Sequence, residues 1–174
     1  MSKKILVLEP YLDQLGGSEK MTYEVAKGLA EKGWEIHLGF VKTGIWRKRY
    51  SSFVKNFHKI PSPAVTIRKP WQIIITAFEL NKKLKKEKLI IVFTSCIAYI
   101  LSLAFLKIFF GIKSCLHLGL SGAVINTIGW RWAMRKISAG IAPSEHIAKS
   151  WQRVGWPDQR LHIVPNWIDW EELS

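Results

Sequence analysis

Short apolar runs alternate along the chain with longer stretches whose apolar positions recur every three or four residues. The runs predict buried strands, and the periodic stretches predict helices that pack on one face. The predicted strands are 5–8, 34–41, 89–93, 114–118, 140–142 and 161–164. The predicted helices are 18–33, with Ser18 as N-cap, 71–86, 97–112, 124–137 and 144–155, with Ser144 as N-cap. In helix 71–86 the periodic positions are Ile74, Ile75, Phe78 and Leu84.

The segment 42–69 is less regular, because Pro61 and Pro63 interrupt it, and we expect only a short strand at 54–60 there. Helix 97–112 is the most hydrophobic stretch, but Ser102 and Lys107 interrupt it and it is shorter than the ~20 residues of a bilayer span. We therefore expect a packed helix rather than a membrane anchor.

This order of elements predicts an α/β fold. The first two strands flank a helix, and such a β-α-β unit has a right-handed crossover and favours parallel pairing. We predict a Rossmann-like, doubly wound, mainly parallel sheet with helices on both faces. A chain of 174 residues suits a single domain, which we expect to span 1–174.

Composition adds a strong positive charge to this picture. The 48% hydrophobic share excludes a disordered chain, and the apolar run after Lys4 is too short for a secretory signal, which predicts a cytoplasmic protein. The chain has 26 Lys and Arg against 13 Asp and Glu, a net charge of +13. Such a field attracts phosphate in nucleic acid, in an anionic lipid surface or in a nucleotide-sugar. The two cysteines, Cys96 and Cys115, have no spacing typical of a metal site or a redox pair.

Candidate chemistry lies in the loops that follow the strands, because doubly wound sheets bind ligands at the carboxyl ends of their strands. Gly16 and Gly17 precede the first helix, where backbone amides can meet a phosphate or a sugar hydroxyl, although a tight turn would explain them equally well. His117 ends a strand and can bind a substrate hydroxyl or act as a general base, although a histidine satisfied within the core is the alternative. The remaining histidines have no convergent partners, so we expect them to be structural or surface residues: His37, His58, His146 and His162.

Several segments together resemble one enzyme family. The loop Gly16-Gly17-Ser18-Glu19, the helix end and strand entry at 30–36, Ala142-Pro143-Ser144-Glu145, and the block 160–169 with its Pro165-Asn166 turn look like glycosyltransferase family 4. His117 matches the strand-end histidine of that family. Trp167 stands where the family usually has glycine.

The resemblance implies the GT-B architecture of two Rossmann-like domains with a cleft between them, an activated-sugar donor and, usually, retention at the anomeric carbon. It implies that 1–174 is the N-terminal, acceptor-side domain, that the chain ends at the interdomain hinge without the C-terminal donor-binding domain, and that it is inactive alone. We expect His117 to be catalytic, Tyr11, Gly16, Gly17 and Asn166 to bind substrate, and a nucleotide-sugar co-substrate with no cofactor and no metal.

Two other function classes fit less well. Nucleic acid would have to bind the basic runs 47–49 and 82–88, but no helix-turn-helix, zinc-finger spacing or RNP-like strand is present. Another Rossmann-like enzyme, an epimerase or a dehydrogenase, would need a glycine-rich fingerprint and an acidic ribose partner, where Phe40-Val41-Lys42 stands instead.

Aromatic and basic residues alternate in two stretches of a chain that has nine tryptophans. This pattern suits a surface that rests on an anionic membrane with a lipid-linked acceptor, as a peripheral protein of the inner face, and it equally suits core tryptophans with solvated neighbours. The membrane-surface candidates are Trp46, Arg47, Lys48, Arg49, Trp130, Arg131, Trp132, Arg135 and Lys136.

Overall fold

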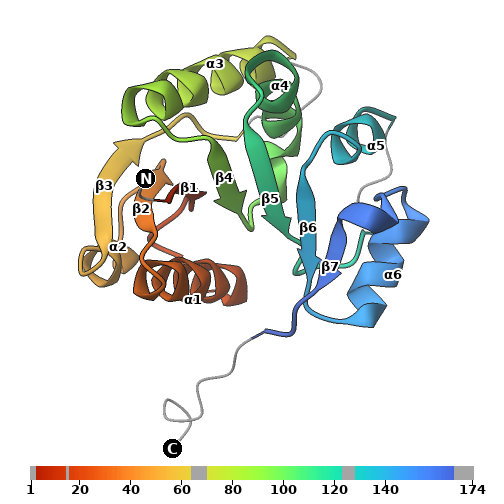
Figure 1. The fold of residues 1–174 in the computed structure, drawn as a ribbon, viewed down its shortest axis with the longest axis horizontal. Helices are drawn as coiled ribbons and strands as arrows, with labels where there is room; N and C mark the ends of the chain where they lie inside the picture. The colour runs from red at the N-terminus through yellow and green to blue at the C-terminus, as the bar shows by residue number, and fades with distance from the viewer. Residues whose placement is uncertain (1–2, 15, 64–69, 123–127, 167–174) are drawn as a thin grey trace, which may run out of the picture.

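A seven-stranded, fully parallel sheet forms the centre of the computed structural model, which describes residues 3–14, 16–63, 70–122 and 128–166 (Figure 1). The strand order is β3-β2-β1-β4-β5-β6-β7. The order reverses between β1 and β4, and such a switch point is where doubly wound sheets open a crevice for ligands. The strands are β1 (Lys4–Leu8), β2 (Glu35–Phe40), β3 (Val54–Lys59), β4 (Ile91–Thr94), β5 (Lys113–His117), β6 (Ala139–Ala142) and β7 (Leu161–Ile163).

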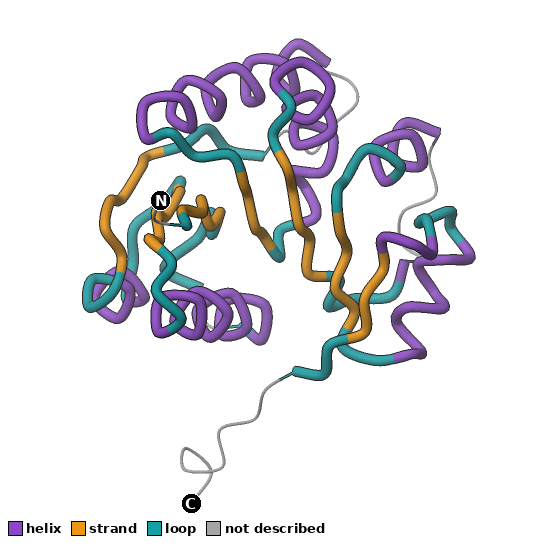
Figure 2. The backbone as a smooth tube through the Cα atoms, viewed as in Figure 1, coloured by secondary structure: helices purple, strands orange, loops and turns teal. Residues whose placement is uncertain are grey.

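Helices cover both faces of the sheet (Figure 2). In β1, Ile5 and Val7 pack with the side of α1 and α2, whereas Leu6 and Leu8 pack with the side of α3 to α6. This alternation follows from the two-residue period of a strand and produces two apolar cores. The helices are α1 (Gly17–Glu31), α2 (Trp46–Tyr50), α3 (Pro70–Glu87), α4 (Ile100–Phe110), α5 (Ile128–Met134) and α6 (Glu145–Arg153).

The sequence prediction of the fold class is confirmed, and every predicted strand is present. The short helix α2 was missed, because five residues are too few to show a helical period. Helix α1 begins two residues earlier than predicted, with Gly16 rather than Ser18 as its N-cap, whereas Ser144 caps α6 as predicted and accepts a hydrogen bond from the Ile147 amide. The N-terminal part of the predicted helix 124–137 lies outside the described residues.

Helix α3 has an apolar outer face as well as an apolar inner face. Of the four periodic positions in the sequence, only Leu84 is buried, and Ile74, Ile75 and Phe78 are 40%, 54% and 56% exposed. The buried face consists instead of Ile73, Ala77, Leu80 and Leu84 with Thr76 and Asn81. The prediction that Ile74, Ile75 and Phe78 pack inward was wrong, because the helix is apolar on more than one side and the period alone does not choose the face. No helix in the described part of the chain has both the length and the hydropathy to cross a bilayer.

Candidate functional site

His117 is the last residue of β5 and lies at the carboxyl edge of the sheet. Its side chain is 5% exposed, and its Nε2 atom lies 3.3 Å from Oδ1 of Asn166, which follows β7. Because an amide oxygen only accepts, Nε2 carries the proton and Nδ1 keeps a lone pair. Nδ1 is buried and has no hydrogen-bond partner among the described residues. Burial lowers the pKa of His117, while the bond to Asn166 opposes that shift, so the ring is neutral at pH 7 and can accept a proton or a hydroxyl hydrogen bond.

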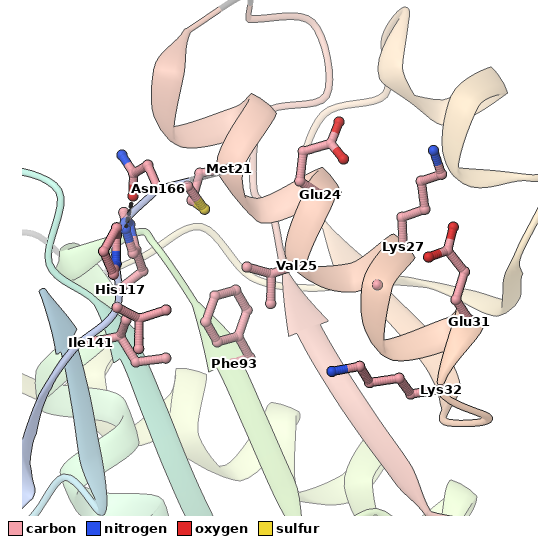
Figure 3. A pocket seen from close by; sticks show the side chains of 13 residues that line it. Met21, Glu24, Val25, Lys27, Glu31, Lys32, Phe93, His117, Ile141 and Asn166 are labelled. Atoms are coloured by element: carbon pink, nitrogen blue, oxygen red, sulfur yellow. Dashed lines mark hydrogen bonds between the residues drawn. The ribbon is translucent and has the colours of Figure 1, made fainter. Parts of the chain in front are cut away.

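Two cavities meet at His117. The larger, about 520 Å³, lies beneath α1 and is lined in part by Met21, Val25, Phe93, Ile141 and Asn166. Figure 3 shows His117 and Asn166 at one end of this cavity and the charged residues of α1 at the other. The cavity is mainly apolar near the histidine, with few polar groups, as is usual for sites that bind small molecules.

The smaller cavity, about 310 Å³, lies at the switch point of the sheet. Ser18 of α1, Ser95 after β4, and the loop Leu118–Ser121 after β5 line it together with His117. A Cβ at Gly119 would lie 3.4 Å from Cε1 and 3.6 Å from Nδ1 of His117, so the loop backbone passes beside the free nitrogen. The indole Nε1 of Trp151 donates to Leu120 O at 2.8 Å and holds that loop against α6. His117 thus lines both cavities, and its free Nδ1 is buried beside the loop that follows β5.

The structure brings together some of the predicted site residues and not others. His117 and Asn166 are in contact, and Ser18, which follows Gly17, lines the same cavity as His117. Gly16 and Gly17 form the N-terminus of α1 but line neither cavity, and nothing lies within 4 Å of a Cβ built on Gly17. Tyr11 is half-buried in the loop after β1, where its backbone forms an isolated parallel β-bridge with Lys42, and it lines neither cavity. Trp167 lies outside the described residues.

Sequence reasoning missed Glu9, a buried carboxyl directly after β1. It is 4% exposed, and burial, followed by the charge of Glu19, raises its pKa to about 7 despite hydrogen bonds to the Thr22 side chain and the Tyr11 backbone. The Thr22 hydroxyl donates to Ser18 O at 2.8 Å and contacts the Ser95 hydroxyl. This polar chain links Glu9 to the smaller cavity, because Ser95 lines it. An acidic residue at the end of an apolar strand is the signal that could have found Glu9.

The prediction that His37 and His58 have no convergent partners was wrong. Their Nδ1 and Nε2 atoms lie 3.1 Å apart, from neighbouring strands. The contact joins residues 21 apart in the sequence, and only the parallel register of β2 and β3 brings them together. His146 and His162 are exposed, as expected.

The prediction that Trp46 and Trp130 face a membrane was also wrong. They are 5% and 8% exposed, and the indole of Trp46 donates to Gln14 O at 2.7 Å. Arg49 stacks over Trp46, and Arg47 stacks over Phe40 and Phe57. These guanidinium groups therefore cover the apolar core on the α1 and α2 side of the sheet. Trp132 is 38% exposed, and Lys48, Arg131 and Arg135 are also on the surface, whereas Lys136 is half-buried.

Comparison with known proteins supplies the family. Residues 15–172 match the model of Glycosyltransferase Family 4. The chain belongs to glycosyltransferase family 4. No curated protein sequence matches the chain. The match covers both His117 and the Pro165-Asn166 turn that holds its ring.

Solved glycosyltransferases share the fold of this family 4 domain. HepE of Anabaena, solved in complex with UDP and glucose, is 16% identical, covers 96% of this chain and 45% of its own, and superposes with a TM-score of 0.70. A glycosyltransferase from Rickettsia africae ESF-5 is 16% identical, with 99% and 45% coverage and a TM-score of 0.73. The chain therefore spans less than half of these proteins and has the fold of one Rossmann-like domain of a GT-B enzyme.

The fold by itself does not fix the reaction. A UDP-N-acetylglucosamine 2-epimerase from Rickettsia bellii is 12% identical, covers 95% of this chain and 45% of its own, and has a TM-score of 0.62. One architecture hosts more than one chemistry, so the family match and the residues of the site carry the argument for sugar transfer.

The buried carboxyl of Glu9 generates a prediction on stability. Its pKa is about 7 in the folded chain against 4.5 for an ordinary glutamate, so the folded state keeps a proton that the unfolded state has lost. The free energy of unfolding therefore falls as pH rises from about 5 to 8, and Glu9 contributes up to about 3 kcal/mol to this decrease. In Glu9→Gln this contribution is absent, so the free energy of unfolding should depend less on pH. Urea denaturation at pH 5, 6, 7 and 8 measures it. Glu79→Gln, on the exposed side of α3, should keep the wild-type slope, and an unchanged slope in Glu9→Gln would contradict the shifted pKa.

Proposed function

We propose that this chain is the acceptor-binding, N-terminal domain of a glycosyltransferase that moves a sugar from a nucleotide-sugar to an acceptor. The donor is bound by a second domain, and the nucleotide-sugar is the only co-substrate, with no cofactor. The single observation that carries the proposal is His117, whose Nε2 contacts Asn166 and whose buried Nδ1 has no partner among the described residues, between two cavities. The family match supports sugar transfer as the reaction.

The position of His117 suits it to a sugar hydroxyl. A neutral imidazole with a free Nδ1 accepts a hydrogen bond from a hydroxyl, and it can take that proton during transfer. Ser18 and Ser95 add further hydroxyls to the smaller cavity, and Phe93 and Ile141 supply apolar surface for a sugar ring or an aglycone in the larger one. We extend the proposal to retention at the anomeric carbon, as the family resemblance implies.

A substitution at His117 tests the role of the site in an enzyme that pairs this chain with a donor-binding domain. We expect His117→Ala to lower kcat/KM by about 10²- to 10⁴-fold, because the proton acceptor is lost. Asn166→Ala frees the ring to turn and should cost about tenfold to a hundredfold, since small misplacements of catalytic groups reduce rates.

His162→Ala is the matched control, because His162 is exposed on β7 and contributes to neither cavity. It should leave kcat/KM unchanged. Folding is checked by urea denaturation of each variant. If folded His117→Ala keeps full turnover, His117 has no role in transfer and the proposed site is wrong.

We also propose that the domain binds an anionic membrane surface, through helices α3, α4 and α5 rather than through Trp46 or Trp130. Five aromatic rings run in contact across these helices: Phe78–Phe110, Phe110–Phe109, Phe109–Phe105 and Phe105–Trp132, with centroids 5.3, 6.4, 5.7 and 5.7 Å apart. We call this series the aromatic strip. Phe109 is 63% exposed and Phe78 56%.

Basic side chains accompany the aromatic strip. Lys85 lies over the ring of Phe110, and α4 and α5, which carry four of the five rings, also carry Lys107 and Arg131. An exposed apolar surface with a cationic border fits the headgroup region of an anionic bilayer, where each Lys or Arg contributes about 1 kcal/mol. A lipid-linked acceptor in the same membrane would then lie within reach of the domain.

Sedimentation with vesicles of mixed anionic and neutral lipid tests this surface. We expect binding at low salt, loss at high salt, and at least tenfold weaker binding of the double variant Phe78→Ser, Phe109→Ser, because two apolar anchors are removed. The control Ile45→Ser removes a 59% exposed apolar side chain beside Trp46 and should bind like wild type. Equal binding of the double variant and the wild type would contradict the role of the aromatic strip, and preferential binding to random duplex DNA would favour nucleic acid instead.

A further inference from the structure

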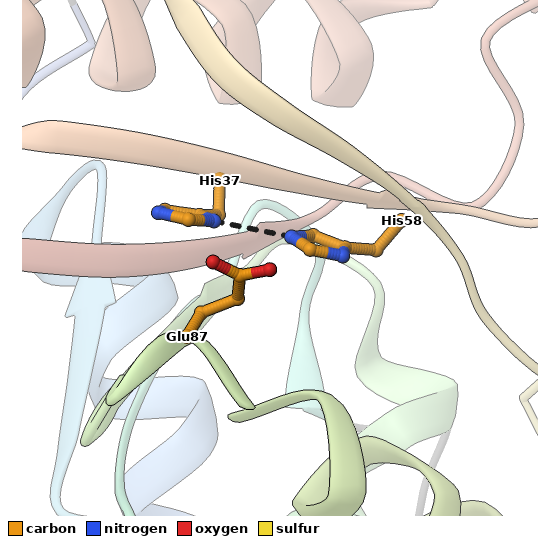
Figure 4. A group of neighbouring side chains, drawn as sticks. All are labelled: His37, His58 and Glu87. Atoms are coloured by element: carbon orange, nitrogen blue, oxygen red, sulfur yellow. Dashed lines mark hydrogen bonds between the residues drawn. The ribbon is translucent and has the colours of Figure 1, made fainter. Parts of the chain in front are cut away.

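Three side chains with metal-binding atoms converge where β2, β3 and the end of α3 meet. They are His37, His58 and Glu87, and one ligand atom from each lies within 4.8 Å of the other two (Figure 4). In Figure 4 the two rings lie edge to edge and the carboxylate of Glu87 points toward the space beside them. None of the three lines the cavities at His117, so the cluster is separate from the proposed sugar site.

The spacing of the two histidines suits one small cation. Nδ1 of His37 and Nε2 of His58 are 3.1 Å apart. Two imidazole nitrogens at 2.0–2.1 Å from a tetrahedral zinc ion lie about 3.3 Å from each other. The rings are 11° from parallel. Zinc binding would require the half-buried ring of His58 to turn and its Nε2 proton to move to Nδ1, which frees a lone pair in place of the shared hydrogen bond.

The carboxylate of Glu35 orients His37 through the ring nitrogen that does not face His58. Nε2 of His37 lies 2.9 Å from Oε1 of Glu35, and Lys4 pairs with the same oxygen at 3.0 Å. His37 therefore donates through Nε2 and presents Nδ1 to His58 and Glu87, which is the arrangement of carboxylate, histidine and metal seen in zinc sites. The side chain of His37 is fully buried, so the packing of the sheet fixes this nitrogen.

The donor set favours zinc over the harder cations. Two imidazoles and one carboxylate are borderline ligands that suit zinc and its transition-metal neighbours, whereas magnesium and calcium prefer oxygen alone. Burial, then the proximity of His37, lowers the pKa of His58, which favours the neutral ring that a metal ligand needs. Lys83 and Lys86 also act on His58 and oppose a cation, while Glu87 and Glu35 favour it. Oε2 of Glu87 accepts a long hydrogen bond from Asn56, at 3.4 Å, which leaves its second oxygen for the ion.

We propose that His37, His58 and Glu87 form a zinc-binding site with one open coordination position. The ion would tie the edge strand β3 to β2 and to the C-terminal end of α3. Because these ligands meet only in the folded chain, zinc stabilises the fold.

Titration of the chelator-treated chain with zinc chloride tests the site. We expect one zinc ion per chain at these residues, and Tm should rise by about 5–10 °C at a zinc concentration a hundredfold above Kd. His58→Ala and Glu87→Gln should each weaken zinc binding at least tenfold. Glu35→Gln, which removes the carboxylate that orients His37 and also pairs with Lys4, should weaken it by about 10- to 100-fold.

His162→Ala is the control for adventitious binding, because His162 is exposed and far along the chain in β7, and it should leave zinc affinity unchanged. Circular dichroism verifies folding, and the isosteric Glu87→Gln decides the matter if His58→Ala does not fold. Failure of the wild type to bind zinc, or equal affinity in the wild type and in folded Glu87→Gln, would overturn the proposal and leave a hydrogen-bonded histidine pair. Neither result bears on sugar transfer, which His117 carries.

Discussion

The parallel pairing of β1, β4 and β5 is the constraint on which the proposed site depends. Parallel strands end at the same edge, so Glu9 after β1, Ser95 after β4 and His117 at the end of β5 come together although they are far apart in the sequence. The pairing of β6 with β7 then delivers Asn166 to His117. A change in the order of these strands would separate every polar group of the site while leaving each strand intact.

The sequence predicted the fold class, all seven strands and the pair of His117 and Asn166, because these depend on local periodicity and on a short motif with fixed spacing. It did not find the contact of His37 with His58, because that contact depends on which strands become neighbours. It also missed Glu9, although an acidic residue at the end of an apolar strand is visible in the sequence. It also misjudged Trp46 and Ile74. An aromatic residue among arginines can be core or surface, and a helix that is apolar on more than one side leaves its buried face undetermined.

Because Trp46 is buried and the outer face of α3 is exposed, the exposed apolar surface lies on α3 and not at Trp46. Arg47 and Arg49 stack on aromatic rings and help to cover the α2 core, so the basic and aromatic alternation there is a packing arrangement. The outer face of α3 and the aromatic strip instead expose phenylalanines beside lysines. Some of the basic side chains thus pack over core aromatic rings and others lie beside the aromatic strip, so the net charge alone does not identify a partner.

The central claim is a division of labour in which this domain provides the acceptor side and another domain binds the nucleotide-sugar. Calorimetric titration of the chain with a panel of nucleotide-sugars, at physiological salt, tests it most directly. The account predicts no saturable binding below a Kd of about 1 mM, because it assigns the donor site to the other domain. Stoichiometric binding of a nucleotide-sugar with micromolar Kd would contradict the account, since the donor site would then lie within this domain.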